Sequence, residues 1–574
     1  MARNVGNHLT TPIRCPTDAE CIVYLGGHAS LSFLDFLRHS LKQLVGDTPF
    51  TDGQQHNPML EPELKETPGA NVTIEPSEKR ALFESYLAVS SGILHLFPED
   101  EAATLLSRTE ASGTSRSPRH DLAAMDMALA IGAQARASGP TDSQYATSCF
   151  TRARAVAFED MLANPSVASV RLFVLLSFFT LEACRQTQAS IYLGIASKAA
   201  VVLGMHQPMS RKMMGEGEGY YSRLRTWHSL CIMDVVTSSL LGRPCTVPRA
   251  TRHSIHSLPL DALQPSFNAM LKAAALLDDI CRVLSRGVLI TAPTAQELLT
   301  SLRHWSRDLP PSLRRFECKD SSTLTYGDQR AVIGNIHVSS MYYFSVILVT
   351  RPFLTRCLMP NIRRQAGTEC RVMTDPAQAA LAQVCTTSAV YMGQLCRHIA
   401  SMLDAWDLPL ATLSLFKTWA FSAGLVLGFS IFAGEPRNDL NEAFTGITQF
   451  LAKTGEASLQ SRLYSETLTG FSDAIALYRR MTRETILAPN QFVEQILAIN
   501  TSPSEVPVSV NKQAPQMDFP SWDHVDSTNT DLLFGTTPTN WAAQLEAAEA
   551  SLEYQDWDNL GMQFSDNFGL DFRA

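Results

Sequence analysis

Apolar residues recur at helical spacing along most of this chain, and the alternating pattern of β-strands is scarce. From about residue 144 to 487 nearly every segment follows the helical period, with short breaks at 206–208, 215–219 and 243–248. Apolar positions that repeat every three or four residues place one face of a helix against a core. The pattern therefore predicts an all-α fold with one large body of many helices.

The first 140 residues alternate between apolar and polar stretches. Residues 21–45 begin like a strand or a turn (CIVYLGG) and continue as an amphipathic helix. Residues 46–76 are rich in Pro, Gly, Asp, Gln and Asn, a composition that is typical of a linker. A helix is predicted to start near Pro76 with Ser77 as its N-cap, and an alanine-rich helix follows over 121–137.

After about Pro489 the composition changes again. Proline residues stand among Ser, Thr, Asn and Asp, which favours disorder over a packed core. The predicted organisation has four parts: an N-terminal segment (1–45), a linker (46–76), a helical body (77–490) and a disordered acidic tail (491–574).

Two long apolar runs raise the question of a membrane. Thr418–Gly434 holds no charged residue over seventeen positions and is bounded by Lys417 and Glu435, while Leu172–Leu181 is shorter. A spanning helix needs roughly 20 apolar residues, so both runs fall at or below the limit. We expect two buried core helices and no membrane association.

The cysteines carry no metal-binding pattern. The chain has 12 of them and no C-x-x-C pair, whereas structural zinc sites need closely spaced thiolates. We expect reduced thiols that are mostly buried as small apolar side chains, and no metal or other cofactor.

Motifs for catalysis are also missing from the sequence. It contains no G-x-S-x-G elbow, no phosphate-binding loop and no H-E-x-x-H. Asp278-Asp279 resembles the start of the aspartate-rich motif of terpene cyclases, but Arg282 stands where that motif needs a third acid. No catalytic, DNA-binding or metal-binding residue is therefore predicted.

Charge is concentrated at one end of the chain. Residues 511–574 hold eleven acidic and two basic residues, so their net charge equals the −9 of the whole chain and the remainder is neutral. Proteins that bind nucleic acid directly normally show a clustered basic face. The sequence predicts no such face.

The stretch 220–248 (YYSRLRTWHSLCIMDVVTSSLLGRPCTVP) is the most informative one. It resembles the middle homology region of fungal-specific transcription factors, in which a helix with Arg, aromatic and Asp positions ends at Gly-Arg-Pro. The matching residues, in chain order, are Arg223, Trp227, Asp234, Gly242, Arg243 and Pro244.

Four more stretches resemble that family in the same order. They are CIVYLGGHASLSFL near residue 21, ALAIGA at 128–133, SIYLGIASKAAVVLGMHQ at 190–207 and MYYFSVILVTRPFL at 341–354. The resemblance covers about residues 20–480. It implies an all-helical regulatory domain of a nuclear transcription regulator that controls a metabolic or biosynthetic gene set and is not an enzyme.

The binuclear zinc cluster that usually accompanies this domain is absent from the sequence. Either an upstream segment supplies it, or the protein acts through partners, and the sequence favours the second. We expect a coactivator as a partner, and a homodimer or a heterodimer with a DNA-binding protein. No direct contact with nucleic acid is predicted.

The tail supports regulation independently of the resemblance. Nine aromatic residues alternate with acids between Asp518 and Phe572, among them Trp541, Trp557, Phe564 and Phe568. Acids keep such rings solvated and available to a shallow apolar groove on a coactivator. We predict an activation domain.

Asp234 leaves two interpretations open. A carboxylate in an apolar helix is costly unless a partner satisfies it, and Arg243 at the helix exit is the predicted cation. Gly242 then acts as a left-handed C-cap and Pro244 stops the helix. The alternative is an α-helical enzyme or small-molecule-binding protein with a pocket near Asp234.

Overall fold

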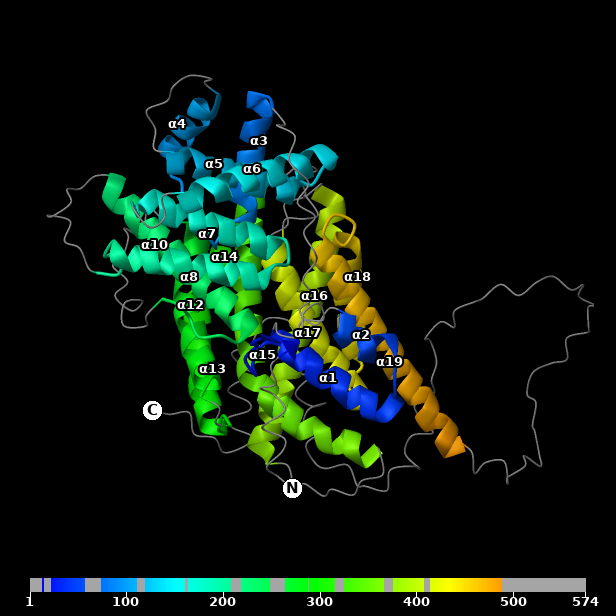
Figure 1. The fold of residues 1–574 in the computed structure, drawn as a ribbon. Helices are drawn as coiled ribbons and strands as arrows, with labels where there is room; N and C mark the ends of the chain where they lie inside the picture. The colour runs from blue at the N-terminus through cyan, green and yellow to red at the C-terminus, as the bar shows by residue number, and fades with distance from the viewer. Residues whose placement is uncertain are drawn as a thin grey trace, which may run out of the picture. The chain divides into compact units, whose positions relative to one another are not determined.

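The protein is all-α, as the sequence predicts. This computed structural model describes residues 13–14, 22–56, 74–110, 119–159, 164–207, 218–247, 264–286, 289–314, 325–365, 375–406 and 413–487. Its strands, β1 (Ile13–Arg14) and β2 (Ile22–Val23), form a small antiparallel pair in register Ile13 to Val23. Everything else that is regular in these ranges is helical (Figure 1).

The first helices in chain order are α1 (Ser30–Val45), α2 (Pro49–His56), α3 (Pro76–Val89), α4 (Glu99–Glu110), α5 (Arg119–Arg136), α6 (Pro140–Glu159), α7 (Val167–Glu182) and α8 (Gln186–Val202). They are followed by α10 (Glu218–Leu241), α12 (Pro265–Leu284), α13 (Ala292–Arg307), α14 (Pro311–Arg314), α15 (Tyr326–Gln365), α16 (Pro376–Trp406), α17 (Ser414–Phe432), α18 (Asp439–Thr454) and α19 (Leu459–Leu487). Chain positions up to 481 form one compact unit, and in the rest only the last turns of α19 are described.

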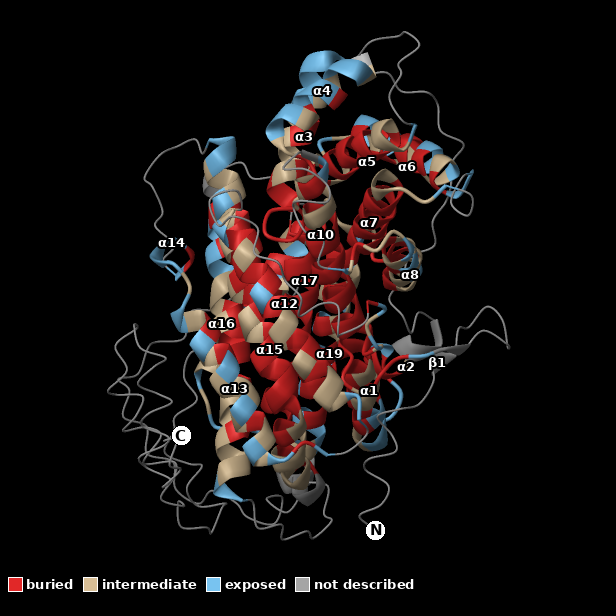
Figure 2. Cartoon of the chain, turned by 90° about the vertical axis from the view of Figure 1, so that its left-hand side faces the viewer, coloured by how far each residue is buried: buried red, intermediate tan, exposed pale blue. Residues whose placement is uncertain are grey.

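Helix α17 is the centre of the core (Figure 2). Its rings meet those of three neighbours: Trp419 faces Phe344 of α15, Phe416 faces Phe450 of α18, and Phe421 stacks on Tyr464 of α19 at 4.2 Å. A helix that is apolar all round must be covered on every side. That requirement explains why α17 is enclosed by other helices.

Among the residues that the structure describes, two helical segments are long and apolar enough to cross a membrane by length and composition, one in α15 and one in α17. The window in α17, Leu415–Phe432, is entirely buried inside the protein, and 72% of the window in α15 is buried. The predicted core positions of Thr418–Gly434 and Leu172–Leu181 are both confirmed, since the second run lies in the buried part of α7.

Helices α5, α6, α7 and α8 lie side by side next to α3 and α10 (Figure 1). Gly132 explains the close approach of α3 to α5, because a Cβ at this position would lie 1.9 Å from the Leu82 carbonyl oxygen. The glycine of the ALAIGA stretch is therefore a requirement of helix packing.

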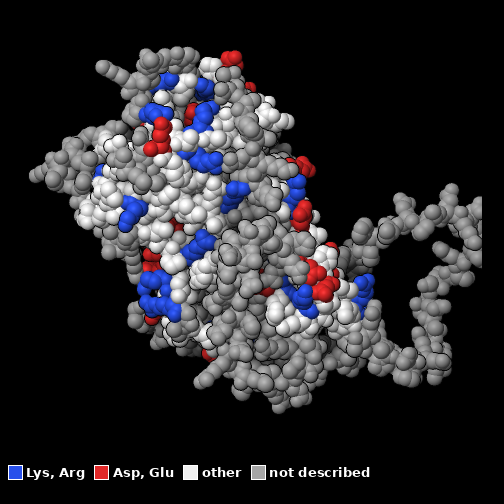
Figure 3. All heavy atoms as spheres, viewed as in Figure 1, with Lys and Arg blue, Asp and Glu red and all other residues white. Residues whose placement is uncertain are grey.

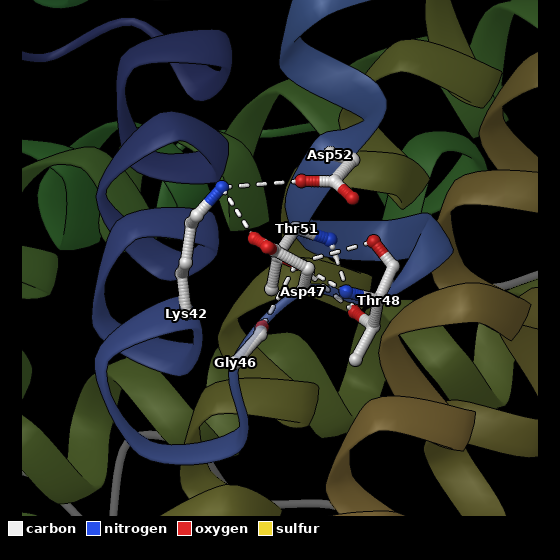
Figure 4. Close-up of polar contacts among 6 residues, drawn as sticks. All are labelled: Lys42, Gly46, Asp47, Thr48, Thr51 and Asp52. Carbon is white, nitrogen blue, oxygen red and sulfur yellow. Dashed lines mark hydrogen bonds and ion pairs between the residues drawn. The ribbon is translucent and has the colours of Figure 1, made fainter.

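Helix α2 lies inside the stretch 46–76 that the sequence predicts to be a linker. Phe50 anchors it, since this ring is buried and stacks on Phe471 of α19 at 4.8 Å. Thr48 and Thr51 hydrogen-bond each other at the start of the helix, and Lys42 of α1 pairs with two aspartates there (Figure 4). The predicted domain boundaries themselves stay predictions.

One predicted cap is wrong. Helix α3 begins at Pro76 as expected, but its N-cap is Glu75, two residues before Ser77, so Ser77 lies inside the first turn. Proline favours this position because its missing N–H would have no intrahelical partner there.

Candidate functional site

The end of α10 shows the cap that the sequence predicts. Gly242 adopts a left-handed conformation with φ of 65°. The backbone N–H of Arg243 donates to the Ser238 carbonyl oxygen at 3.0 Å, the six-residue bond of a Schellman motif. Trp227 and Asp234 lie on the same helix and are both buried.

Asp234 binds the loop that follows its own helix. One carboxylate oxygen accepts hydrogen bonds from the Thr246 backbone N–H at 3.0 Å and from the Thr246 hydroxyl at 2.6 Å. The other accepts the Val247 N–H at 2.8 Å. Only 1% of Asp234 is exposed, and bonds to a buried charged acceptor are the stronger kind. The carboxylate therefore fixes the loop 243–247 against the helix.

Arg243 donates from Nε to the Tyr24 carbonyl oxygen at 3.1 Å, so it contacts the N-terminal segment. The backbone N–H groups of Thr246 and Val247 bond the Asp234 carboxylate. The predicted ion pair between Asp234 and Arg243 stays a prediction.

The N-terminal segment meets this loop. The Gly26 N–H donates to the Leu241 carbonyl oxygen at 3.0 Å. Both glycines are needed for the contact, because a Cβ on Gly26 would lie 1.8 Å from the Gly242 carbonyl oxygen and one on Gly242 would lie 2.7 Å from Gly26 Cα. We call residues 24–29 and 242–247 together the signature junction.

Arg351 of α15 supports the same segment from another side. Its Nη2 donates to the His28 and Ala29 carbonyl oxygens, and its guanidinium lies 5.0 Å from the centre of the Phe33 ring. Burial lowers the pKa of Arg351 to about 10 and, with the charge of Arg351, lowers the pKa of His28 to about 4. Three stretches that are far apart in the sequence, near residues 26, 242 and 351, therefore lie together.

The surroundings of Asp234 can be compared with what an enzyme would need. Asp278 of α12 accepts a hydrogen bond from the Cys245 thiol at 3.3 Å, and Asp279 pairs with Arg282 at 3.0 Å. Within the ranges that the structure covers, no group of three His, Cys, Asp or Glu residues is arranged to hold a metal ion. The contacts described at Asp234 are hydrogen bonds from the loop that follows its helix.

Three histidines, His95, His228 and His337, are at least largely buried. His337 is fully enclosed and its Nδ1 lies 2.8 Å from the Ser91 carbonyl oxygen. Burial lowers the pKa of His95 and of His337 to about 4. Both are neutral core residues at pH 7.

Buried charges of the core were not predicted from the sequence. Arg171 of α7 bonds Glu101 at 2.6 Å and the Ser222 hydroxyl at 2.6 Å. Lys417, expected at the edge of an apolar run, is fully buried, and burial lowers its pKa to about 8 against the opposing charge of Glu182. No local pattern distinguishes these residues from solvated ones.

On the face drawn in Figure 3, the described Lys and Arg side chains are interspersed with Asp and Glu. The predicted activation-tail residues Trp541, Trp557, Phe564 and Phe568 lie outside the described residues.

Comparison with known proteins places this helical protein beside fungal regulators. It is 22% identical over 325 residues to transcription factor FBD3 of Gibberella moniliformis (strain M3125 / FGSC 7600), a match that covers 50% of this chain and 41% of that protein. It is 24% identical over 392 residues to transcription factor FBD3 of Fusarium pseudograminearum (strain CS3096), which covers 58% of this chain and 49% of that protein. The chain thus spans about half the length of the curated relatives it matches. No family model matches it.

Proposed function

We propose that this protein is a nuclear transcription regulator of the fungal-specific transcription factor type. The observation that carries the proposal is its similarity to two fungal proteins named transcription factors. The junction of Gly26, Gly242 and Arg351 adds support, because residues of three separate family-like stretches contact one another there.

In this proposal the helical body is the middle homology region. It positions the tail and responds to an effector, and the protein controls a metabolic or biosynthetic gene set. The protein forms a homodimer or a heterodimer, and it reaches DNA through a DNA-binding partner. On the face drawn in Figure 3 the described charges of both signs are mixed, which favours a partner over a direct basic interface on that face.

The tail supplies activation in this scheme. Its alternating acids and aromatics suit a shallow apolar groove of a coactivator, which the rings enter while the acids keep the free segment soluble. The region 541–554 (WAAQLEAAEASLEY) has the composition of a helix that forms on binding.

A reporter assay tests the activation function. Residues 511–574 are fused to an unrelated DNA-binding domain, and the matched control carries alanine at Trp541, Trp557, Phe564 and Phe568. We expect activation by the native tail and its loss in the control, which keeps all eleven acidic residues. Equal activity of the two fusions, or silence of both at equal nuclear amounts, contradicts the proposal.

A further inference from the structure

The N-terminus of α1 is buried and lacks a capping side chain. The helix begins at Ser30 after Ala29, which makes no side-chain capping hydrogen bond. Ala29 is fully buried and Ser30 is 5% exposed. The first N–H groups of a helix carry partial positive charge and favour an anion. The first N–H groups of this helix therefore need hydrogen-bond acceptors from neighbouring groups or from a ligand.

The main neighbour is a buried cation. Arg351 is 5% exposed, and its Nη2 donates to the carbonyl oxygens of His28 and Ala29, the two residues directly before α1. Its Nη1 is buried without a hydrogen-bond partner. In the described part of the chain no carboxylate forms an ion pair with Arg351, whereas Arg171, which is equally buried, has Glu101. A buried guanidinium without an anion costs several kcal/mol.

Two further polar groups at this helix end lack partners. The Oγ of Ser30 and the Nε2 of His28 are buried, and neither makes a hydrogen bond. Both belong to residues at or directly before the first turn of α1. Arg351 bonds the backbone of the two residues before α1, so its charge lies beside this helix end, which His28 and Ser30 flank in the sequence. Native proteins leave few such groups unsatisfied, and each one calls for an explanation.

We propose that the N-terminus of α1 binds a small oxygen anion, the carboxylate or phosphate group of a metabolite. Arg351 Nη1 supplies the charge, Ser30 Oγ a hydroxyl donor and the first turn of α1 its N–H groups. Ser30 and Arg351 are both buried, so the anion enters by movement of residues 24–29. That segment reaches the surface at Tyr24, which is 53% exposed. Its contact with Gly242 connects the site to the signature junction.

Binding of an anion here does not depend on the proposed function. The interpretation of that anion as an effector does depend on the proposed function. The effector acts because occupation of the site changes how residues 24–29 pack against α10. The chemistry of the site is compatible with phosphate and with carboxylate, and the test separates the two.

The experiment measures thermal unfolding of the purified full chain in sodium phosphate and in sodium succinate at constant ionic strength. We expect the midpoint to rise with at least one of the two anions in the native protein. Arg351→Gln is expected to abolish the rise. The control Arg356→Gln removes another arginine of α15, one that bonds the Ile290 carbonyl oxygen, and keeps the rise.

Should Arg351→Gln fail to fold, Ser30→Ala takes its place and affinity is measured by calorimetry. Loss of one donor to a charged group is expected to weaken binding about tenfold. An unchanged midpoint of the native protein in both anions overturns the proposal. So does an equal rise in the Arg351→Gln and Arg356→Gln variants, or an unchanged affinity in Ser30→Ala.

Discussion

Gly26 and Gly242 touch through their backbones, although more than two hundred residues separate them in the sequence. A side chain on Gly26 would occupy the position of the Gly242 carbonyl oxygen, 1.8 Å from its Cβ. The contact lies where α10 ends and where the N-terminal segment crosses it, held by the hydrogen bond from Gly26 to Leu241. Both glycines are therefore fixed by packing as well as by the turn.

Gly26→Ala is expected to lower the free energy of unfolding by about 3 kcal/mol, because the two backbones must separate. Gly242→Ala loses a similar amount and adds the strain of a left-handed alanine, about 1–3 kcal/mol. The matched control is Gly194→Ala in the middle of α8, where an added Cβ meets nothing within 4 Å. This control variant is expected to have a free energy of unfolding about 0.5–1 kcal/mol higher than that of the native protein. Urea unfolding measures all three, and a Gly26→Ala protein as stable as the native one contradicts the contact.

His337 makes stability depend on pH. Burial lowers its pKa in the folded protein to about 4, against 6.5 in the unfolded chain. Between these values the unfolded state binds the proton and the folded state does not, so stability is complete above pH 6.5 and falls as the pH drops towards 4. The loss from this residue is on the order of 3 kcal/mol at pH 4. His28 and His95 act in the same direction.

The measurement compares urea midpoints of the native protein and His337→Gln from pH 7 down to pH 4.5. The variant starts less stable because it loses the bond to Ser91, but its stability should fall less steeply with pH. Parallel curves for the two proteins would show that His337 does not titrate as described.

Arg171 is expected to contribute far more to the free energy of unfolding than a surface arginine does. Arg171→Leu leaves Glu101 and the Ser222 hydroxyl without the guanidinium that bonds both, and should cost about 3–5 kcal/mol. Arg397→Leu breaks a pair with Glu442 whose side chains are 43% and 66% exposed, and should cost less than about 1 kcal/mol. Chemical denaturation of the two variants decides this, and equal losses would argue against a special role of the buried pair.

Repeating local patterns made much of the fold predictable. The helical period identified the all-α class and the buried runs in α7 and α17, and glycine followed by Arg-Pro marked the cap at Gly242. Helix α2 was missed because PFTDGQQH has the composition of a loop. Its stability comes from the stacking of Phe50 on Phe471, a contact between distant parts of the chain.

The site was predicted less completely, for the same reason. Trp227, Asp234 and Gly242 were identified by their resemblance to a family helix and its exit, but the partners of Asp234 depend on how the loop returns after the cap. Arg351 and Lys417 resemble ordinary charged residues in the sequence, since burial is decided by helices that arrive from elsewhere. The tertiary partner of a single charged residue cannot be predicted from the local sequence pattern.

Asp234 offers the most direct test of the claim that its carboxylate fixes the loop 243–247 against α10 and is not a catalytic group. Asp234→Asn removes the charge that accepts two backbone N–H groups and the Thr246 hydroxyl. Its control, Asp279→Asn, affects the partly exposed pair with Arg282 and should cost less than about 1 kcal/mol. Equilibrium urea unfolding should show Asp234→Asn less stable than the native protein by about 2–3 kcal/mol. An Asp234→Asn protein that unfolds at the native midpoint would contradict this structural role and favour a chemical role for this residue.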